Sequence, residues 1–301
     1  MITYYKRNLK DKKLKRLDAF QTGCWINVVN PTEEEIEFLT EKFDLDKQNL
    51  ISGLDKNEVP RVEFDEGNTY ILVKLISTSK QLLSTCLILL TDKFILTLSA
   101  EEPEFVRKIF EKKIKLVTAQ KLKVLIKFLD TIDDEFERAT INIVKIINAK
   151  KSASEEMKEN DLNILLQQEE KLNSFISAYS YATLIYGRLI KKIRFFEEDK
   201  EIMEDLIIDS NQGLNMCKSS LKTISNLRGY HTIMLSNKMN RTITMLTIFM
   251  AFLGISTTIT GFYGMNVSLP FQNNSLVFLY IIISILMVGV LLIVYFLKSK
   301  L

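Results

Sequence analysis

The C-terminal end of the chain decides the fold, because residues 276–297 read LVFLYIIISILMVGVLLIVYFL. As a helix this stretch is about 33 Å long, which is enough to cross a hydrocarbon core about 30 Å thick. Residues 242–263 form a second window of sufficient length, richer in threonine and glycine. No Asp, Glu, Lys, Arg or His occurs from Thr242 to Leu297. We therefore predict two transmembrane helices, over residues 242–263 and 276–297.

The two windows differ in polarity. The second carries one serine and one glycine and is expected to face lipid, whereas the hydroxyls and glycines of the first favour contact with protein or water. Positive residues precede the first span and follow the second, while the loop at 264–275 has no charge. Because positive flanks stay inside, we expect both termini, including the tail at 298–301, on the cytoplasmic side of the cell (inner) membrane and the loop outside.

The rest of the chain lacks the signatures of several functional classes. The formal net charge of the 301 residues is +3, so basic and acidic residues are too nearly balanced for a dedicated nucleic-acid-binding protein. Cys24, Cys86 and Cys217 lie far apart without a C-x-x-C pair, so neither a disulfide framework nor a zinc knuckle is indicated. The single histidine, His231, is interpreted as a solvated helix residue. No glycine-rich nucleotide motif occurs, and we expect no enzyme activity and no organic cofactor.

Residues 1–112 are expected to form a cytoplasmic α/β domain. A helix should start after Thr32, with Glu35 in capping-box spacing, and Thr91-Asp92-Lys93 should turn a hairpin. The predicted strands are Cys24–Val29, Arg61–Phe64, Thr69–Ser77, Leu83–Leu90 and Phe94–Ser99.

Residues 113–241 are expected to form a cytoplasmic region of long helices and a stalk. The periodicity predicts helices over Glu104–Met157, Asp161–Phe196 and from Lys200 onward. With no proline between Pro103 and Pro270, the last helix can run unbroken through Tyr263. A charged helix of that length needs partners, which suggests a bundle or an oligomer. The fold class predicted is thus an α+β cytoplasmic domain followed by long α-helices and two C-terminal transmembrane helices.

The start of this last helix is strongly acidic, with seven Asp and Glu residues between Glu197 and Asp209. Two interpretations remain open. The simpler one is a solvated helix start at which the dipole favours acids. The other is a set of oxygen ligands for a hard divalent cation shared between subunits.

The first span ends in Tyr263-Gly264-Met265-Asn266, and Ser236-Asn237-Lys238-Met239-Asn240 lies upstream. In this setting, closing the first of two C-terminal spans, the motif closely resembles the CorA family of magnesium transporters, whose signature is Y-G-M-N. The resemblance is firm over residues 205–301. It is looser in Trp25-Ile-Asn-Val-Val-Asn-Pro-Thr-Glu-Glu and in Pro60-Arg61-Val62-Glu63.

The resemblance implies a funnel-shaped homopentamer that conducts Mg²⁺ through a pore lined by the first span. It places Gly264, Met265 and Asn266 at the outer mouth as a selectivity filter, with Thr257 and Asn240 along the pore. Asp205 matches an acid that helps to bind a regulatory Mg²⁺ between cytoplasmic domains. Its partner acid on the neighbouring subunit is not placed, and the nearby candidates are Glu101, Glu102 and Glu104.

The residues themselves suit this role. Mg²⁺ gives up its waters reluctantly, so recognition of the hydrated ion needs uncharged acceptors, such as Asn266 side-chain carbonyls and Gly264 backbone carbonyls. Gly264 should allow a bend where the helix ends, and Met265 should pack rather than bind the ion. Helical spacing back from Gly261 predicts one pore face made of Thr257, Gly254, Met250, Thr247, Ile243 and Asn240.

Three departures from the family pattern weaken the attraction of the pore for cations. Ile255 stands where typical family members have a proline in the first span. Gly229 stands where some members have an acidic residue near the inner mouth of the pore. The external loop reads Leu269-Pro270-Phe271-Gln272, without the family's glutamate. These changes leave the cation ranking open, including transport of Co²⁺ or Ni²⁺.

Two alternatives were weighed. A transporter of zinc or another divalent cation in the same family is disfavoured by Met265, because the zinc branch usually carries G-I-N. A non-transporting membrane-anchored coiled-coil or sensor protein is disfavoured by the threonine-rich first span, since a plain anchor has no need of polar positions.

Overall fold

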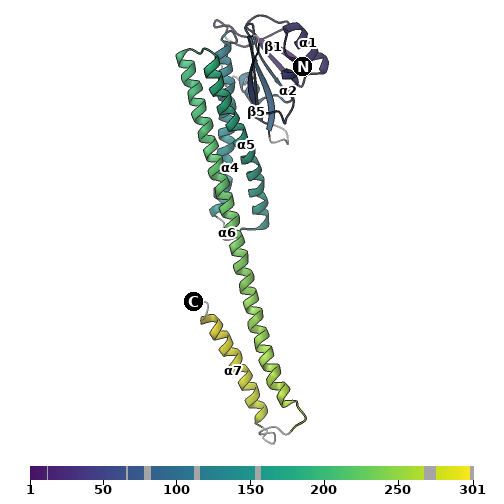
Figure 1. Cartoon of the computed structure of the whole chain (residues 1–301), viewed down its shortest axis with the longest axis vertical. Coiled ribbons are helices and arrows are strands. Elements are labelled where there is room, and N and C mark those ends of the chain that lie inside the picture. The colour runs from purple at the N-terminus through teal and green to yellow at the C-terminus, as the bar shows by residue number, and fades with distance from the viewer. Residues whose placement is uncertain are drawn as a thin grey trace. The chain divides into compact units, whose positions relative to one another are not determined.

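The structure is a computed structural model that describes residues 1–11, 13–65, 67–77, 83–111, 116–152, 157–267 and 276–298. The chain divides into two compact units, Met1–Leu227 and Arg228–Leu301. Helix α6 (Glu197–Tyr263) contributes to both units (Figure 1). The predicted external loop at 264–275 is described only as far as Val267, so the Leu269–Gln272 segment lies outside the described residues.

A seven-stranded mixed sheet forms the centre of the first unit, with the strand order β2-β1-β3-β7-β6-β5-β4. Strands β3 and β7 pair in parallel, and the other neighbours pair antiparallel. The strands are β1 (Ile2–Lys6), β2 (Lys15–Leu17), β3 (Trp25–Val29), β4 (Arg61–Asp65), β5 (Asn68–Ile76), β6 (Leu83–Leu90) and β7 (Ile95–Ser99).

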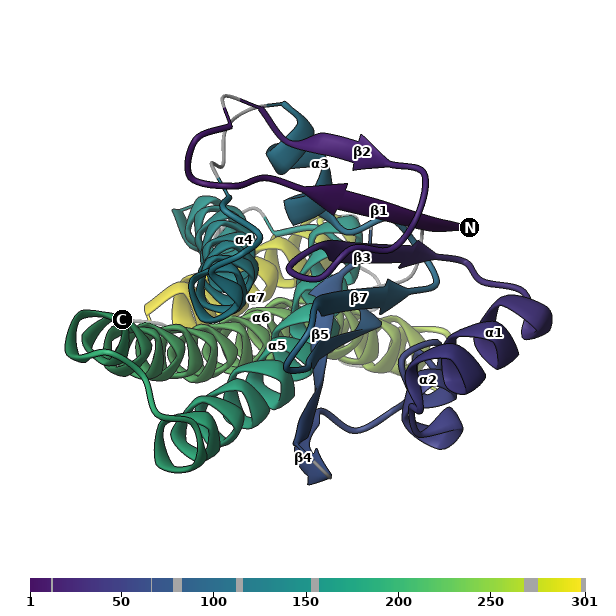
Figure 2. The ribbon, with the colours of Figure 1, turned by 90° about the horizontal axis from the view of Figure 1, so that it is seen from above.

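Helices cover both faces of this sheet (Figure 2). On one face lie α1 (Glu33–Phe43) and α2 (Lys47–Ser52). The other face carries α3 (Glu104–Phe110), α4 (Lys121–Ser152), α5 (Glu159–Lys192) and the first part of α6. Alternate strand residues therefore enter two separate cores: Trp25 packs towards α4, and its neighbour Ile26 packs towards α1 and α2.

The predicted strands from residue 24 to residue 99 are confirmed to within one or two residues. The predicted capping box is also confirmed, because the Glu35 amide donates to Thr32 Oγ1 (3.3 Å) and the Thr32 amide donates to Glu35 Oε2 (3.1 Å). The hairpin turn is closed by the Thr91 amide, which donates to the Phe94 carbonyl (3.0 Å).

The prediction of one helix over Glu104–Met157 was wrong. Helix α3 ends at Phe110 and α4 begins at Lys121. Contacts with the N-terminal segment hold residues 116–118 in a non-helical path: the Thr118 amide donates to the Arg7 carbonyl (3.0 Å), and Arg7 Nη1 donates to the Leu116 carbonyl (3.1 Å). These tertiary hydrogen bonds override a local helical pattern. Strands β1 and β2 were not predicted.

The long helices otherwise follow the expectation. Helix α5 begins two residues earlier and ends four residues earlier than predicted, at Lys192. Helix α6 is continuous from Glu197 to Tyr263, as predicted, with an earlier start. The fold class is confirmed as a mixed-sheet domain with long helices and two apolar C-terminal helices.

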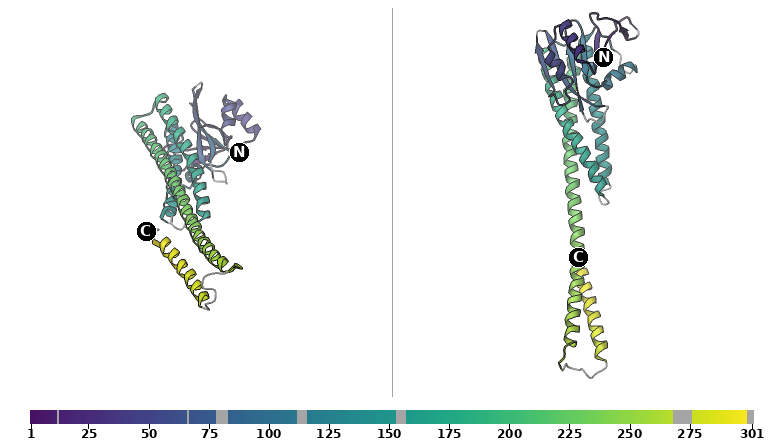
Figure 3. Two further views of the ribbon diagram at one scale, coloured as in Figure 1. Left: turned by 60° about the horizontal axis from the view of Figure 1, so that its bottom comes forward. Right: turned by 90° about the vertical axis from the view of Figure 1, so that its right-hand side faces the viewer.

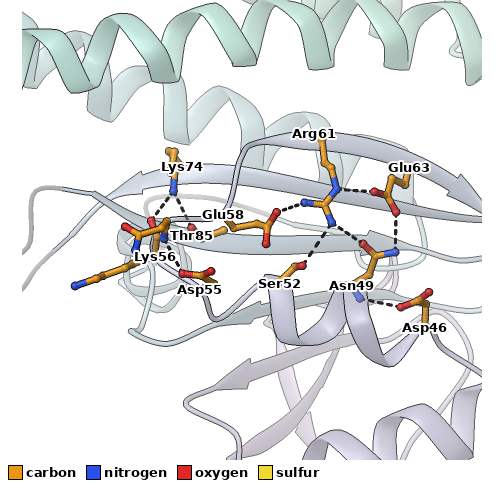
Figure 4. Close-up of polar contacts among 11 residues, drawn as sticks. Asp46, Asn49, Ser52, Asp55, Lys56, Glu58, Arg61, Glu63, Lys74 and Thr85 are labelled. Atoms are coloured by element: carbon orange, nitrogen blue, oxygen red, sulfur yellow. Dashed lines mark hydrogen bonds and ion pairs between the residues drawn. The ribbon is translucent and has the colours of Figure 1, made fainter.

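A polar network anchors α2 to the edge of the sheet (Figure 4). The Arg61 guanidinium on β4 donates from Nε to Glu63 Oε1 (2.5 Å), from Nη2 to Asn49 Oδ1 (3.2 Å), and pairs through Nη1 with Glu58. Asn49 Nδ2 in turn donates to Glu63 Oε2 (2.9 Å). The hydrogen bond from Arg61 holds the pKa of the Glu63 carboxyl below its usual value. Because Arg61, Glu63 and Asn49 are each bonded to the other two, the network fixes the position of α2.

The second unit is a helical hairpin. Helix α7 (Val277–Lys298) lies alongside the last part of α6 in both views of Figure 3. Gly289 permits this approach, since a Cβ atom there would lie 2.9 Å from Phe252 Cε2. Both α7 and the C-terminal part of α6 are long and apolar enough to cross a membrane.

Candidate functional site at the end of the first apolar helix

The Y-G-M-N motif lies where α6 ends. Its last helical residue is Tyr263, and the Gly264 amide donates to the carbonyls of Thr260 (2.9 Å) and Gly261 (3.2 Å). The Met265 amide continues this tightened turn by donating to the Phe262 carbonyl (3.3 Å). The predicted bend at Gly264 is therefore present. The backbone there is not left-handed, since the glycines with positive φ are Gly23 and Gly67 among the described residues.

The predicted pore face is the side of α6 that α7 leaves uncovered. Its members are exposed in the single chain: Asn240, Ile243, Thr247, Met250, Gly254, Thr257 and Gly261. A different set of residues faces α7 and is half-buried: Thr244, Ile248, Ala251, Phe252, Ser256 and Ile259. Burial therefore separates the two sides of the helix, and the predicted face is available to line an opening.

Hydrogen bonding distinguishes Thr257 from the other threonines of α6. The Thr247 hydroxyl donates to the Ile243 carbonyl (2.9 Å), and the Thr258 hydroxyl donates to the Gly254 carbonyl (2.8 Å). Each remaining threonine of α6 also donates to a carbonyl one turn back, except Thr257. In the part of the chain that the structure describes, the Thr257 hydroxyl makes no such bond and so remains available to a hydrated ion.

The amides at the two ends of the predicted face are similarly uncommitted. Within the described ranges, the side chains of Asn240 and Asn266 make no hydrogen bond, and both residues are exposed. Met265 is 51% exposed in the single chain, and its packing in an assembly stays a prediction. The site consists of uncharged oxygen acceptors at both ends of an apolar helix.

The predicted regulatory acid, Asp205, is exposed on α6. Of the acids named as candidate partners on a neighbouring subunit, Glu101 accepts from Ser77 Oγ (2.8 Å), Glu104 pairs with Arg107, and Glu102 is exposed. Among the described residues no three His, Cys, Asp or Glu side chains gather closely enough to hold a metal ion. The binding of a regulatory cation between Asp205 and a second chain stays a prediction.

The acidic start of α6 does begin a helix, as the simpler interpretation expects, with Glu197, Glu198 and Asp199 in its first turn. Asp199 departs from that interpretation, because it is buried at 4% exposure rather than solvated.

A small acidic cavity between α4, α5 and α6 was not foreseen. Its volume is about 50 Å³, and its carboxyl groups come from Asp130, Asp133, Asp134, Glu137 and Asp209. Ser210 Oγ donates to both oxygens of Asp133 (3.0 and 3.2 Å). Burial, aided by the neighbouring carboxylates, raises the pKa of Asp133 to about 7. The sequence gives no signal for it, because only the packing of α6 on α4 buries Asp133.

Comparison with known proteins identifies the family of this chain. The sequence model of the family described as CorA-like Mg²⁺ transporter protein matches residues 20–298. The chain belongs to this family. The cobalt/magnesium transport protein CorA of Methanocaldococcus jannaschii is similar to it, with 25% identity over 92% of this chain and 90% of the relative.

Solved structures agree in fold with this CorA-like chain. The complete structure of the CorA magnesium transporter from Methanocaldococcus jannaschii superposes with a TM-score of 0.87, at 21% identity, covering 99% of this chain and 98% of that one. The full-length CmaX protein superposes with a TM-score of 0.76, at 16% identity, covering 97% and 96%. The resemblance inferred from Y-G-M-N is therefore confirmed at the level of the family.

Proposed function

We propose that the chain forms a homopentameric channel that carries Mg²⁺ across the cell membrane. The first span of each subunit lines the pore, α7 faces the bilayer, and both termini lie in the cytoplasm. The observation that carries this proposal is the exposed face of α6 that ends in Y-G-M-N and holds an uncommitted Thr257 hydroxyl and Asn266 amide. Membership of the CorA-like family and the positively charged flanks of both spans support it.

Selection takes place at a ring of Asn266 side chains and Gly264 carbonyls. These acceptors hydrogen-bond to the waters that Mg²⁺ retains, so the ion enters without shedding its hydration shell. Below the ring, hydroxyl and amide positions alternate with Met250 and Ile243, and apolar rings of this kind can gate by dewetting.

The membrane potential supplies the driving force. Inward movement of a dication releases roughly 4.6 kcal/mol per 100 mV, because each unit charge contributes about 2.3 kcal/mol. Gating follows from linkage: Mg²⁺ bound between cytoplasmic domains, with Asp205 as one ligand, favours the closed arrangement, and its loss leaves carboxylates that repel each other.

The test is Mg²⁺ uptake into vesicles that contain the purified full-length chain. We expect Asn266→Ala to lose most of the uptake while retaining the oligomeric state of the unaltered chain. The matched control is Asn163→Ala, which removes an exposed amide from α5 and should transport normally. Equal uptake by Asn266→Ala and the unaltered chain would remove the basis of the proposal.

The same vesicles separate the alternatives. Co²⁺ is a second expected substrate, since the relative from Methanocaldococcus jannaschii is named a cobalt/magnesium transport protein. Uptake of Zn²⁺ in preference to Mg²⁺ would favour the zinc alternative. No uptake of any divalent cation by a correctly assembled chain would favour a membrane-anchored sensor.

A further inference from the structure

A large cavity in the first unit lies at the N-terminus of α4, away from the predicted pore. Its volume is about 590 Å³. It is assembled from segments far apart in sequence, namely the turn at Gly67, the β6–β7 turn at Asp92, the start of α4, the end of α5 and the start of α6. Nothing in the transport proposal uses this cavity.

Three lysines line the cavity beside the positive end of α4. Lys121 and Lys123 occupy the first helical turn, where cations are unfavourable because the helix dipole and the unpaired amides are positive. Lys192 is exposed and has no ion-pair partner in the described ranges. The opposing charges are Asp92 and a buried carboxylate, which leaves an excess of positive charge facing the cavity. An anionic group would offset this excess.

Lys121 is held in place by the protein. Its ammonium donates to the carbonyls of Thr91 and Asp92, each at 2.5 Å. An ammonium has three N–H donors, so one remains for a ligand. The Lys123 ammonium lies 3.9 Å from Asp199 Oδ1, a separation that leaves its donors free.

The second observation is an orphaned acceptor in the same wall. Asp199 lines the cavity at 4% exposure, and in the described part of the chain its Oδ2 atom has no hydrogen-bond partner. A buried carboxylate oxygen without a donor is costly. A ligand that brings an N–H or O–H group to Asp199 would remove that cost.

The third feature is an aromatic ring. Phe196 borders the cavity and is 76% exposed. Removing the surface of such a ring from water is favourable in free energy. Next to it Ile193 is half-buried. A flat heterocyclic base would cover this ring by stacking.

We propose that this cavity binds a nucleoside polyphosphate. The phosphates lie against Lys121 and Lys123 at the start of α4 and against Lys192 at the end of α5. The base stacks on Phe196, and a donor of the nucleoside satisfies Asp199. Such a site is built from separate segments and not from one glycine-rich loop. A search of the sequence for nucleotide-binding motifs therefore does not detect it. The inference is independent of ion transport.

The test measures equilibrium binding of radiolabelled ATP, and of tripolyphosphate as its base-free counterpart, to the full-length chain in detergent with EDTA. We expect saturable ATP binding with a dissociation constant below about 1 mM. Lys192→Glu should lower the affinity for both ligands at least about tenfold. The matched control is Lys218→Glu, an exposed lysine on α6 outside the cavity, which should change neither.

Two further variants test the nucleoside contacts. Phe196→Ala should lower the affinity for ATP about fivefold or more and leave the affinity for tripolyphosphate unchanged. Asp199→Asn should lower the affinity for ATP relative to tripolyphosphate by a similar factor, because removing the charge favours a pure anion while weakening the hydrogen bond to the nucleoside. The proposal is overturned by the absence of saturable ATP binding, by equal losses in Lys218→Glu and Lys192→Glu, or by a Phe196→Ala chain that binds ATP normally.

Discussion

Replacing Asp133 by Asn tests how the helices of the first unit bury a carboxyl group between them. The carboxyl group releases its proton near pH 7 in the folded chain, against 3.8 ordinarily. Between these pH values the folded state therefore holds a proton that the unfolded state has lost, and stability falls as the pH rises through this window. Once both states are ionised, the charge costs the folded state about 4 kcal/mol.

Asp133→Asn removes this cost and keeps an acceptor for Ser210. We expect the free energy of unfolding of the variant to equal that of the unaltered chain near pH 4. At pH 8 it should be higher by up to about 4 kcal/mol. The assay is urea unfolding of the full-length chain in detergent with EDTA. Its reporter is Trp25, the single tryptophan, which is fully buried in the same core as α4.

The control is Asp134→Asn, which neutralises the adjacent carboxylate, itself half exposed and paired with Arg138 at 3.2 Å. Because Asp134 contributes only a minor part of the raised pKa of Asp133, the stability difference should rise between pH 4 and pH 8 by much less than it does for Asp133→Asn. A difference between Asp133→Asn and the unaltered chain that is constant with pH would refute the reasoning. So would a variant that is less stable at pH 8.

Three further predictions concern packing, the α2 anchor and gating. Gly213→Ala should lose about 2 kcal/mol in the same unfolding assay, because its Cβ would overlap Tyr179, whereas Gly187→Ala has open space and should gain up to about 1 kcal/mol. Arg61→Lys should lose about 1 to 2 kcal/mol, since an ammonium cannot replace the forked hydrogen bonds to two carboxylates, and an unchanged midpoint would contradict this role for the network. Asp205→Ala should raise the internal Mg²⁺ concentration needed to close the channel in patch recordings, and unchanged closure would exclude that residue from gating.

Local signals were sufficient for much of the fold. The strands of the central hairpins alternate or are continuously apolar between turn residues, and the Thr32 cap is encoded within four residues. Strand β2 is only three residues long and mostly exposed, so it has no period to detect. The break before α4 depends on hydrogen bonds to Arg7, more than a hundred residues away, which no local pattern contains.

The two kinds of site differ in the same way. The motif at Gly264–Asn266 is contiguous and could be predicted, because its residues follow one another at a helix end. The cavity at the start of α4 and the buried Asp133 depend on how separate helices pack. The simpler interpretation of the acidic segment placed Asp199 at a solvated helix start because its sequence neighbours are acidic. Only the packing near Lys123 shows that it is buried.

The most direct measurement of the central claim is the accessibility of a cysteine on the predicted pore face. The three native cysteines are fully buried and should not react, so a single introduced thiol can be followed. In Mg²⁺-transporting vesicles, an external charged thiol reagent should stop uptake by Thr257→Cys and leave Ile255→Cys, on the opposite side of α6, active. Continued uptake by modified Thr257→Cys, or an equal block of both variants, would contradict a pore lined by this face.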